Sequence, residues 1–297
     1  MKELEGKVII ITGSSGLVGF NLIKSIPGFM NPPLIITIDS RQDITNKECI
    51  DALPEADYII HAAGYGQPGK FVKDKLKTIA INTTATMELL KKLKPGGKFL
   101  FISTSEVYNG LDNPPFREDQ IGTTKTTDPR ACYIESKRCG EAICLAARES
   151  GQDVKIARLS LAYGPGTKKG DARVLNQFIE QGLTGFINLK DHGEARRTYL
   201  YIDDAISMMW DILLKGKDAI YNVGGNSYTT ILELARKIGK MTNAEIIIPL
   251  REDTLAGSPN NVCLDMSKVL EEFGQRDFIS LEEGLKRTIE WQKENFL

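Results

Sequence analysis

The sequence has few of the residues that build metal centres and disulfide frameworks. Its 297 residues include two histidines and five cysteines, and no two cysteines have the CxxC spacing. A structural metal site of the Cys/His type is therefore not expected. An odd number of cysteines without a regular spacing is typical of reduced thiols, so we predict a cytoplasmic protein without disulfides.

The sequence also lacks long apolar runs and an excess of one charge. Its formal net charge is −1, and no basic tail points to a nucleic acid or an anionic membrane as a partner. The longest apolar runs, such as residues 8–11, are far too short to cross a bilayer. The N-terminus has neither the basic start nor the apolar core of a signal peptide. With 41% hydrophobic residues, the chain can bury one large or two medium-sized cores.

Short β-branched runs alternate with helical patterns over the first 160 residues. The predicted strands are residues 7–12, 33–39, 56–64, 97–105 and 154–160, and the predicted helices are 20–26, 78–93 and 132–150. This alternation predicts an α/β fold with a doubly wound parallel sheet of the Rossmann type.

After residue 164, predicted strands and helices no longer alternate regularly. The predicted elements are a helix at 173–182, an irregular segment at 187–202, a strand at 219–225 that returns to the sheet, and helices near 230–241 and 281–294. We therefore predict a dinucleotide-binding domain of residues 1–164, with a returning segment near 198–225. A smaller, mixed C-terminal substrate-binding domain would comprise residues 165–197 and 226–297, with a cleft between the two domains.

Three glycines follow the first predicted strand with the spacing G-x-x-G-x-x-G, at Gly13, Gly16 and Gly19. In a dinucleotide-binding turn the first glycine allows the tight turn, the second lets backbone approach a diphosphate, and the third lets helix and sheet pack closely. The start of the following helix offers free N–H groups to the phosphates. This context predicts dinucleotide binding, although a glycine-rich strand-to-helix turn alone is a weak signal.

An acidic residue stands at the end of the second predicted strand. Asp39 lies twenty residues after the last glycine of the turn, where a carboxylate hydrogen-bonds the ribose hydroxyls of NAD and repels the 2′-phosphate of NADP. This favours NAD as the cofactor. Arg41 is close enough along the chain to bind a 2′-phosphate, so the choice of NADP stays open.

Tyr133 and Lys137 stand four residues apart on a predicted helix and therefore lie on one face of it. A lysine cation stabilises a tyrosinate and lowers its pKa towards the range of a working base. Thr104 ends a predicted strand, the place where ligands bind in an open α/β sheet. These groups suit proton removal from a sugar alcohol while hydride leaves for a nicotinamide. The alternative is a surface pair with no function, because this spacing also arises by chance.

Several motifs together resemble one family. The glycine turn, HAA (61–63), STSEVY (103–108), YIESK (133–137) and YGPG (163–166) resemble the extended short-chain dehydrogenase/reductases that modify nucleotide sugars. STSEVY followed by DPRACYIESKR most resembles UDP-glucuronate decarboxylases, and STSE also resembles GDP-mannose 4,6-dehydratases.

The resemblance implies a role for four residues. Tyr133 would be the base on the sugar 4-hydroxyl, Lys137 would tune it and hold the nicotinamide ribose, and Thr104 would share the 4-oxygen. Glu106 would be the second acid/base residue; the alternative is an exposed carboxylate at the end of a strand. The implied reaction oxidises the sugar at C4 with bound NAD, decarboxylates or dehydrates it, and returns the hydride. A 4-epimerase, an NAD(P)H-dependent keto-sugar reductase and a non-catalytic NAD-binding regulator are the alternatives.

The resemblance also implies which residues bind the ligands. The expected cofactor-binding residues are Gly13, Ser15, Gly16, Leu17, Gly19, Asp39, Ser40, Asp43, Ile44, Ala62, Ala63, Ser103, Tyr133 and Lys137. The expected substrate-binding residues are Ser105, Arg173 and Arg197; the two arginines match positions that face the nucleotide diphosphate, where a guanidinium binds phosphate in a bidentate manner. The helices at 78–93 and 131–149 match a dimer interface in relatives, which implies a homodimer.

The match has three gaps on the substrate side. Leu161 and Gln177 stand where the decarboxylases have asparagine, and residues 258–266 lack their basic run. The segment from Asp39 to Asp57 is also short and skips a helix and a strand. The nucleotide base, the sugar and the final reaction therefore stay open.

Overall fold

The centre of the molecule is a six-stranded sheet in which every neighbouring pair of strands is parallel. The computed structural model describes residues 1–250 and 261–297. The strand order is β2-β1-β3-β4-β5-β9, with bounds Leu34–Ile38, Val8–Thr12, Ala56–His61, Leu93–Thr104, Asp153–Leu159 and Ile220–Val223. The chain passes from β1 to β2 on one side and then crosses to β3 on the other, which places the ligand crevice at the carboxyl ends of β1 and β3. The predicted Rossmann-type sheet is confirmed.

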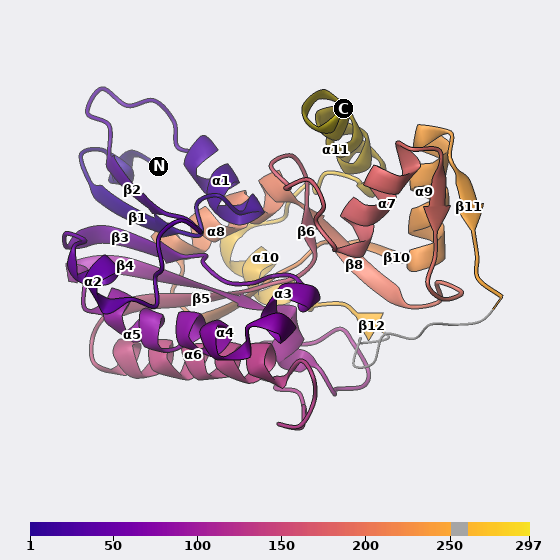
Figure 1. Ribbon diagram of the computed structural model, residues 1–297. Helices are drawn as coiled ribbons and strands as arrows, with labels where there is room; N and C mark the ends of the chain where they lie inside the picture. The colour runs from indigo at the N-terminus through magenta and orange to yellow at the C-terminus, as the bar shows by residue number, and fades with distance from the viewer. Residues whose placement is uncertain (251–260) are drawn as a thin grey trace.

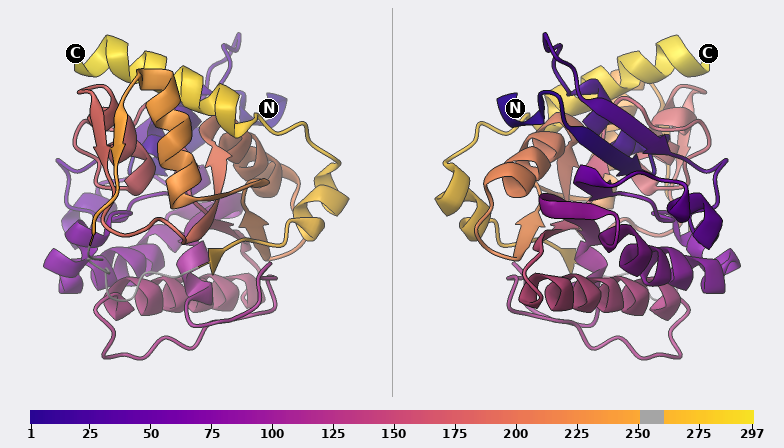
Figure 2. Two further views of the ribbon diagram at one scale, coloured as in Figure 1. Left: turned by 90° about the vertical axis from the view of Figure 1, so that its right-hand side faces the viewer. Right: turned by 90° about the vertical axis from the view of Figure 1, so that its left-hand side faces the viewer.

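Helices cover both faces of this sheet (Figures 1 and 2). One face carries α1 (Leu17–Lys24) and α8 (Ile202–Lys215). The other carries α2 (Lys47–Asp51), α3 (Pro68–Lys73), α4 (Lys75–Asn82), α5 (Thr84–Leu90) and α6 (Ala131–Glu149). Ile9 and Ile11 of β1 belong to the core cluster that includes α8, whereas Ile10 belongs to the cluster that includes α5. A strand buried on both faces has to be apolar at consecutive positions, which explains the run of isoleucines.

The second half of the chain forms smaller sheets beside the first (Figure 1). The element bounds are β6 Ala162–Tyr163, β7 Phe186–Asn188, β8 Arg196–Tyr201, β10 Ser227–Thr230, β11 Glu245–Ile247, β12 Asn261–Val262, α7 Val174–Gly182, α9 Ile231–Thr242, α10 Ser267–Phe273 and α11 Leu281–Phe296. Strand β8 pairs with β10, β12 and β6, and β11 pairs with β7. Short 3₁₀ turns cover Lys2–Leu4 and Ser105–Tyr108.

Three local predictions differ from the structure. The helix expected at 78–93 is broken at Thr83, whose φ of −118° and ψ of −76° separate α4 from α5. The irregular segment at 187–202 contains most of β7 and all of β8. The apolar run at 33–39 predicts a strand buried on both faces. In the structure it is the edge strand β2, which pairs only with β1 among the described residues and leaves Leu34 59% exposed.

The edge position of β2 follows from the short connection to β3. Between the two strands the structure has only the five-residue helix α2, and no strand of the described residues pairs with the outer side of β2. This agrees with the prediction that this region skips a helix and a strand. Within the described ranges 1–250 and 261–297, no helix combines the length and apolar character required to span a bilayer.

Candidate active site

The tyrosine and lysine of the YIESK motif lie on the first turns of α6, and both are buried. Tyr133 is 8% exposed and Lys137 is 4% exposed. The Lys137 ammonium donates a hydrogen bond to the carbonyl oxygen of Ile102 at 2.7 Å and lies 4.6 Å from the centre of the Phe101 ring. Its nitrogen is also 3.7 Å from the position that a Cβ at Gly64 would occupy. The lysine therefore lies inside the molecule, next to the residues that follow β3.

Burial shifts the pKa values of both Tyr133 and Lys137. It raises the pKa of Tyr133 to about 12; the charge of Glu106 adds to this rise, and hydrogen bonding to Thr104 opposes it. Burial lowers the pKa of Lys137 to about 7, against the opposing effect of Glu141. Desolvation disfavours the charged form of each group, which is why the two pKa values move in opposite directions. Tyr133 is thus a protonated phenol at neutral pH in this arrangement, and forming a phenolate there requires added positive charge nearby.

Thr104 and Glu106 bring two further groups to the same place. Thr104 ends β4, is buried and accepts a hydrogen bond from the backbone N–H of Glu106 at 3.2 Å. The Glu106 carboxylate is paired with the guanidinium of Arg130, through Nε at 3.0 Å and through a second, short contact from Nη2. Thr104 and Glu106 therefore lie at the phenol of Tyr133, and Lys137 lies one turn further along α6.

Arg130 was not predicted, although it lies within the DPRACY motif that carried the family resemblance. It is 8% exposed, and its guanidinium lies 5.3 Å from the centre of the Phe71 ring. Phe71 in turn stacks on Tyr133 with 4.6 Å between ring centres and an angle of 5° between the planes. Arg130 thus contacts the acid and, through one aromatic ring, supports the phenol.

A buried polar network lies beneath these residues. The Ser103 hydroxyl donates to Glu141, and Glu141 is paired with Arg158 at 2.7 Å. Arg158 also donates to the Tyr108 hydroxyl at 2.8 Å, which donates to Asn222 at 2.7 Å. Ser103 was predicted to bind the cofactor, but its side chain is engaged in this network.

The glycine turn has the shape of a dinucleotide cradle. A Cβ at Gly13, whose φ is +71°, would lie 2.5 Å from the carbonyl oxygen of Ala62, and a Cβ at Gly19 would lie 2.4 Å from that of Gly13. Gly16 is the N-cap of α1 and has no side-chain cap. Side chains at these positions would fill the space against β3 and α1, so the turn fits the backbone approach that a diphosphate needs. Leu17 begins the helix and is buried.

The residues expected around the adenosine lie at the ends of β2 and β3. The Asp39 carboxylate pairs with Arg41 at 2.6 Å, which lowers its pKa to about 2; Ser40 between them is exposed. Asp43 pairs with Lys77 at 2.8 Å, and its pKa is lowered to about 2 mainly by that hydrogen bond. Ile44 is buried beside it. Two carboxylates with well-lowered pKa values thus remain charged at neutral pH.

Residues of the HAA motif connect neighbouring elements of the sheet. The N–H of Ala63 donates to the Thr12 hydroxyl at 3.0 Å, and Ala62 packs against the first glycine of the turn. The ring nitrogens of His61 contact the Thr12 hydroxyl at 2.8 Å and the carbonyl oxygen of Ile81 at 3.0 Å. Burial lowers the pKa of His61 to about 3, so it is a neutral side chain that joins β1, β3 and α4.

The predicted substrate arginines come from outside the six-stranded sheet. Arg197 lies on β8, and burial lowers its pKa. The charge of Arg130 lowers this pKa further, whereas the charge of Glu106 raises it. Arg173 precedes α7 and pairs with Asp171 at 2.7 Å, and its charge lowers the pKa of Tyr133. Both arginines therefore act electrostatically on the site. Ser105 is half-buried beside Glu106.

Of the three substrate-side positions that differ from the decarboxylase pattern, two lie on residues that the structure describes. Leu161 is partly buried and packs on the apolar core, so it offers no hydrogen bond to a ligand. Gln177 lies on α7, next to the buried Asn176, whose side-chain oxygen has no partner among the described residues. The third departure lies partly outside the described residues, because it includes residues 258–260.

A parallel dinucleotide-type sheet, a glycine turn after its first strand and a buried Tyr-x-x-x-Lys pair define an NAD-dependent enzyme of the extended short-chain dehydrogenase/reductase class. Residues 9–224 match the model of the NAD dependent epimerase/dehydratase family, and the chain belongs to that family. It is an NAD-dependent enzyme, so the dinucleotide binding predicted from the glycine turn and the preference for NAD predicted from Asp39 are confirmed.

Curated relatives match almost the whole chain. UDP-glucuronic acid decarboxylase 1 of Danio rerio is 28% identical, over 98% of this chain and 74% of its own length. UDP-glucuronic acid decarboxylase 3 of Arabidopsis thaliana is 31% identical, over 93% of this chain and 86% of its own length. The named activities of these relatives agree with a nucleotide-sugar-modifying enzyme.

Solved structures show the same fold. UDP-glucose 4-epimerase of Thermotoga maritima, solved with UDP-glucose, has a TM-score of 0.84 at 23% identity, covering 98% of this chain and 100% of that one. RMD of Pseudomonas aeruginosa, complexed with NADPH, has a TM-score of 0.82 at 25% identity, covering 97% of this chain and 99% of that one.

Proposed function

We propose that the chain oxidises a nucleotide sugar at C4 with bound NAD and then decarboxylates it, as a UDP-glucuronate decarboxylase-like enzyme, with 4,6-dehydration as the closely related outcome. The observation that carries this proposal is the Glu106 carboxylate, which comes two residues after Thr104 and acts on the pKa of Tyr133. In the family resemblance simple 4-epimerases have no carboxylate at this position, and an acid/base group beside the base is what chemistry at C5 needs. The curated decarboxylase relatives support the same reading.

Each residue has a role in this proposal. Tyr133 takes the proton of the sugar 4-hydroxyl, and Thr104 holds the same oxygen by a hydrogen bond. When bound, NAD would supply the nicotinamide ring that holds the hydride taken from C4 until it is returned to the sugar. The ammonium of Lys137 holds the nicotinamide ribose and stabilises the phenolate. Glu106 moves a proton at C5 or assists loss of the C5 carboxylate.

The ligands are proposed to lie on either side of the catalytic residues. The cofactor occupies the glycine turn, Asp39, Asp43 and the HAA segment, and the diphosphate of the sugar nucleotide contacts Arg173 and Arg197. Residues 1–164 with the returning segment near 198–225 would form the cofactor-binding domain. Residues 165–197 and 226–297 would form the substrate-binding domain.

The test is a product-mass assay. The protein is incubated with UDP-, GDP-, CDP- and dTDP-sugars, including a hexuronate of each base. Loss of CO₂ identifies a decarboxylase, loss of water identifies a dehydratase, and net oxidation of added NAD(P)H identifies a reductase. Absence of any mass change or cofactor turnover with every sugar would overturn the proposal.

A 4-epimerase is the second candidate. Leu161 replaces the substrate-contacting asparagine of the decarboxylases and presents an apolar side chain to the core. An epimerase returns the hydride to the opposite face of the 4-keto sugar without changing the mass. Chromatographic separation of the two C4 epimers in the same assay detects it.

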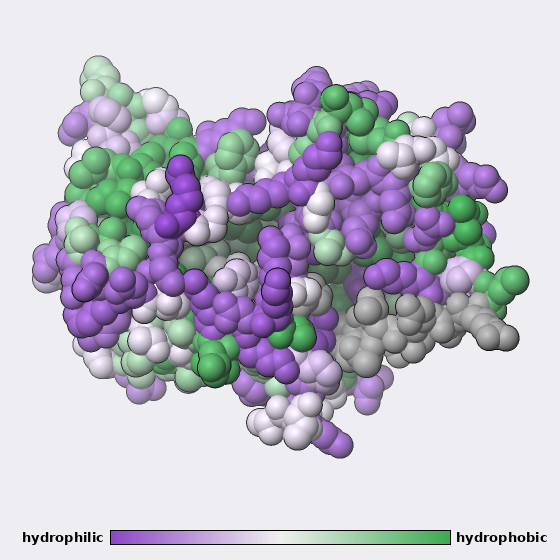
Figure 3. Space-filling model, viewed as in Figure 1, coloured by the Kyte–Doolittle hydropathy of each residue, from purple (hydrophilic) through white to green (hydrophobic). Residues whose placement is uncertain are grey.

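We also propose that the enzyme is a homodimer. The outer face of α4 and α5 exposes three large apolar side chains, with Leu76 82%, Ile79 39% and Met87 44% exposed. A small hydrophobic patch appears in Figure 3 where Figure 1 draws α4, one of several on this face. Exposed apolar side chains that gather on one face mark an association surface.

Sedimentation velocity tests this interface. The Leu76→Glu/Ile79→Glu double variant is expected to sediment as a monomer, because two buried unpaired charges would disrupt an apolar interface. The control is Met30→Glu, since Met30 is fully exposed in the loop before β2 and should leave the dimer intact. A parent protein that sediments as a monomer at micromolar concentration would refute the proposal.

A further inference from the structure

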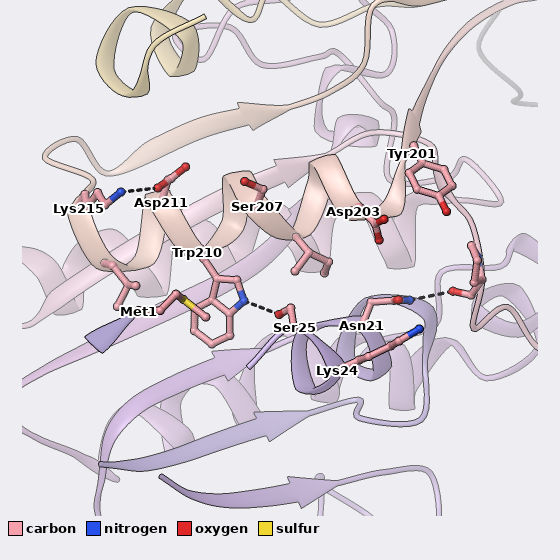
Figure 4. A pocket seen from close by; sticks show the side chains of 13 residues that line it. Met1, Asn21, Lys24, Ser25, Tyr201, Asp203, Ser207, Trp210, Asp211 and Lys215 are labelled. Atoms are coloured by element: carbon pink, nitrogen blue, oxygen red, sulfur yellow. Dashed lines mark hydrogen bonds and ion pairs between the residues drawn. The ribbon is translucent and has the colours of Figure 1, made fainter. Parts of the chain in front are cut away.

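The loop of residues 164–171 begins at the YGPG motif and lies against the cofactor turn. The side chain of Asn21 on α1 donates to the carbonyl oxygen of Pro165 at 2.9 Å, a contact visible in Figure 4. A Cβ at Gly166, whose φ is +95°, would lie 2.6 Å from the ring of Phe20. Two contacts therefore hold the first half of this loop on α1, the helix that begins at the glycine turn.

The next part of the loop brings a cation to the turn itself. The Lys168 ammonium lies 3.1 Å from the hydroxyl oxygen of Ser15, a residue inside the turn and 153 positions away in sequence. Its charge also contributes to the lowered pKa of the Asp39 carboxylate. Lys168 thus acts on both the diphosphate end and the ribose end of the predicted cofactor site.

The turn has no charge of its own to offer a diphosphate. Residues 13–19 contain no lysine or arginine, so their contribution is limited to backbone N–H groups and the dipole of α1. A dinucleotide diphosphate carries negative charge on its non-bridging oxygens. A lysine placed beside the turn supplies the missing countercharge as a flexible point charge.

We infer that Lys168 binds the diphosphate of the dinucleotide cofactor and that its loop thereby holds the cofactor against the glycine turn. This inference deepens the proposed function and rests on the assignment of NAD to that turn. The ammonium exchanges its contact with Ser15 for the phosphate oxygens, a shift that its exposed, flexible side chain allows.

The neighbouring lysine provides a matched control. Lys169 is also exposed, but its ammonium donates to the carbonyl oxygen of Phe296 at 2.6 Å, at the end of α11. Lys168→Gln and Lys169→Gln therefore remove the same charge one residue apart in the same loop. Only the first removes a cation from the turn.

The experiment measures binding of NAD and of adenosine by calorimetry, and release of NAD by stopped-flow fluorescence, on protein first freed of bound nucleotide. We expect Lys168→Gln to weaken NAD binding about fivefold, as for loss of one partly exposed ion pair, and to flatten its salt dependence. Lys169→Gln should stay within about twofold of the parent, and Lys168→Arg should restore binding. Adenosine, which has no phosphate, should bind all four proteins equally.

Two outcomes would overturn the inference. One is equal NAD affinity and release in Lys168→Gln and Lys169→Gln; the other is a parallel loss of adenosine binding, which would mean that the loop only shapes the pocket. Neither readout uses a sugar. If the parent modifies sugars and Lys168→Gln binds NAD as tightly as the parent, only the inference about Lys168 is refuted. If Lys168→Gln weakens NAD binding but the parent modifies no sugar, the inference about Lys168 stands and the proposed reaction is refuted.

Discussion

The chemistry proposed for this protein depends on a buried phenol and on the charges around it. Around the phenol of Tyr133 stand one carboxylate, Glu106, and the guanidinium of Arg130 that pairs with it. The pair keeps the carboxylate fixed beside the base, since a bidentate guanidinium contact defines both position and orientation. Burial raises the pKa of the phenol, so its activity as a base depends on how much positive charge reaches it.

Glu106→Gln is the first residue-scale prediction. The amide keeps the size of the side chain but cannot move a proton, so we expect the step at C5 to slow by about 10²–10⁴-fold. Oxidation at C4 should persist, so a 4-keto sugar should accumulate, which mass spectrometry and the nicotinamide absorbance would both report. Unchanged decarboxylation or dehydration in this variant would remove Glu106 from the site.

The pH dependence of stability tests the burial of Lys137. Burial lowers its pKa to about 7 in the folded protein from the ordinary lysine value of 10.5, so between these values the unfolded chain binds more protons than the folded one. Stability therefore rises as the pH increases from 7 towards 10. Below pH 7 the destabilisation caused by burying this lysine has its full size. The expected gain between pH 7 and 9 is on the order of 2 kcal/mol.

The control for this pH dependence is Lys137→Met, which has no group to titrate. Urea unfolding at pH 7 and pH 9 should show the gain in the parent and not in the variant. A parent and a variant with parallel pH profiles would mean that the ammonium is well solvated.

Single elements begin and end where local side chains satisfy the backbone. Helix α9 starts with a complete capping box, in which Thr230 accepts from the N–H of Glu233 at 3.0 Å and Glu233 accepts from that of Thr230 at 2.8 Å. Helix α11 is capped by Ser280, whose hydroxyl accepts a hydrogen bond from the N–H of Glu283 at 3.2 Å. Both starts were readable from the sequence, because a capping residue acts on the backbone only two or three residues away.

Thr230→Ala tests the capping of α9. Losing a side-chain acceptor at an N-cap costs about 1 kcal/mol, so the free energy of unfolding should fall by about that amount with no change in NAD affinity. Urea denaturation measures the first quantity and calorimetry the second.

At the scale of the whole molecule, one buried network joins the sheet to the site. Arg158 of β5 pairs with Glu141 of α6 and contacts Tyr108, which in turn contacts Asn222 of β9. Arg158 is 2% exposed. Four segments of the chain are thus fixed together, and Ser103, the neighbour of Thr104, joins the same network through Glu141.

Arg158→Met should lower the free energy of unfolding by about 3–5 kcal/mol, because it leaves Glu141 buried without its cation. Chemical denaturation measures this loss. The double variant Arg158→Met/Glu141→Leu removes both charges and should recover part of it. A single variant as stable as the parent would show that the network contributes little.

The sequence alone determined those features that depend on neighbours a few residues apart. Runs of β-branched residues gave the buried strands, since a strand covered on both faces has to be apolar at consecutive positions. The glycine turn, the Tyr133–Lys137 spacing and the helix caps could be predicted for the same reason. The edge exposure of β2 and the break at Thr83 could not be predicted, because they depend on which strand or helix lies alongside.

Only the tertiary structure decided which distant groups meet. The pairing of Arg130 with Glu106, the stacking of Phe71 on Tyr133 and the contact of Lys168 with Ser15 join residues between 24 and 153 positions apart. No periodicity in a sequence encodes such contacts, because they follow from the order of strands in the sheet and from the path of the loops between them. The sequence thus defined the chemical groups of this enzyme, and the fold set their electrostatic surroundings.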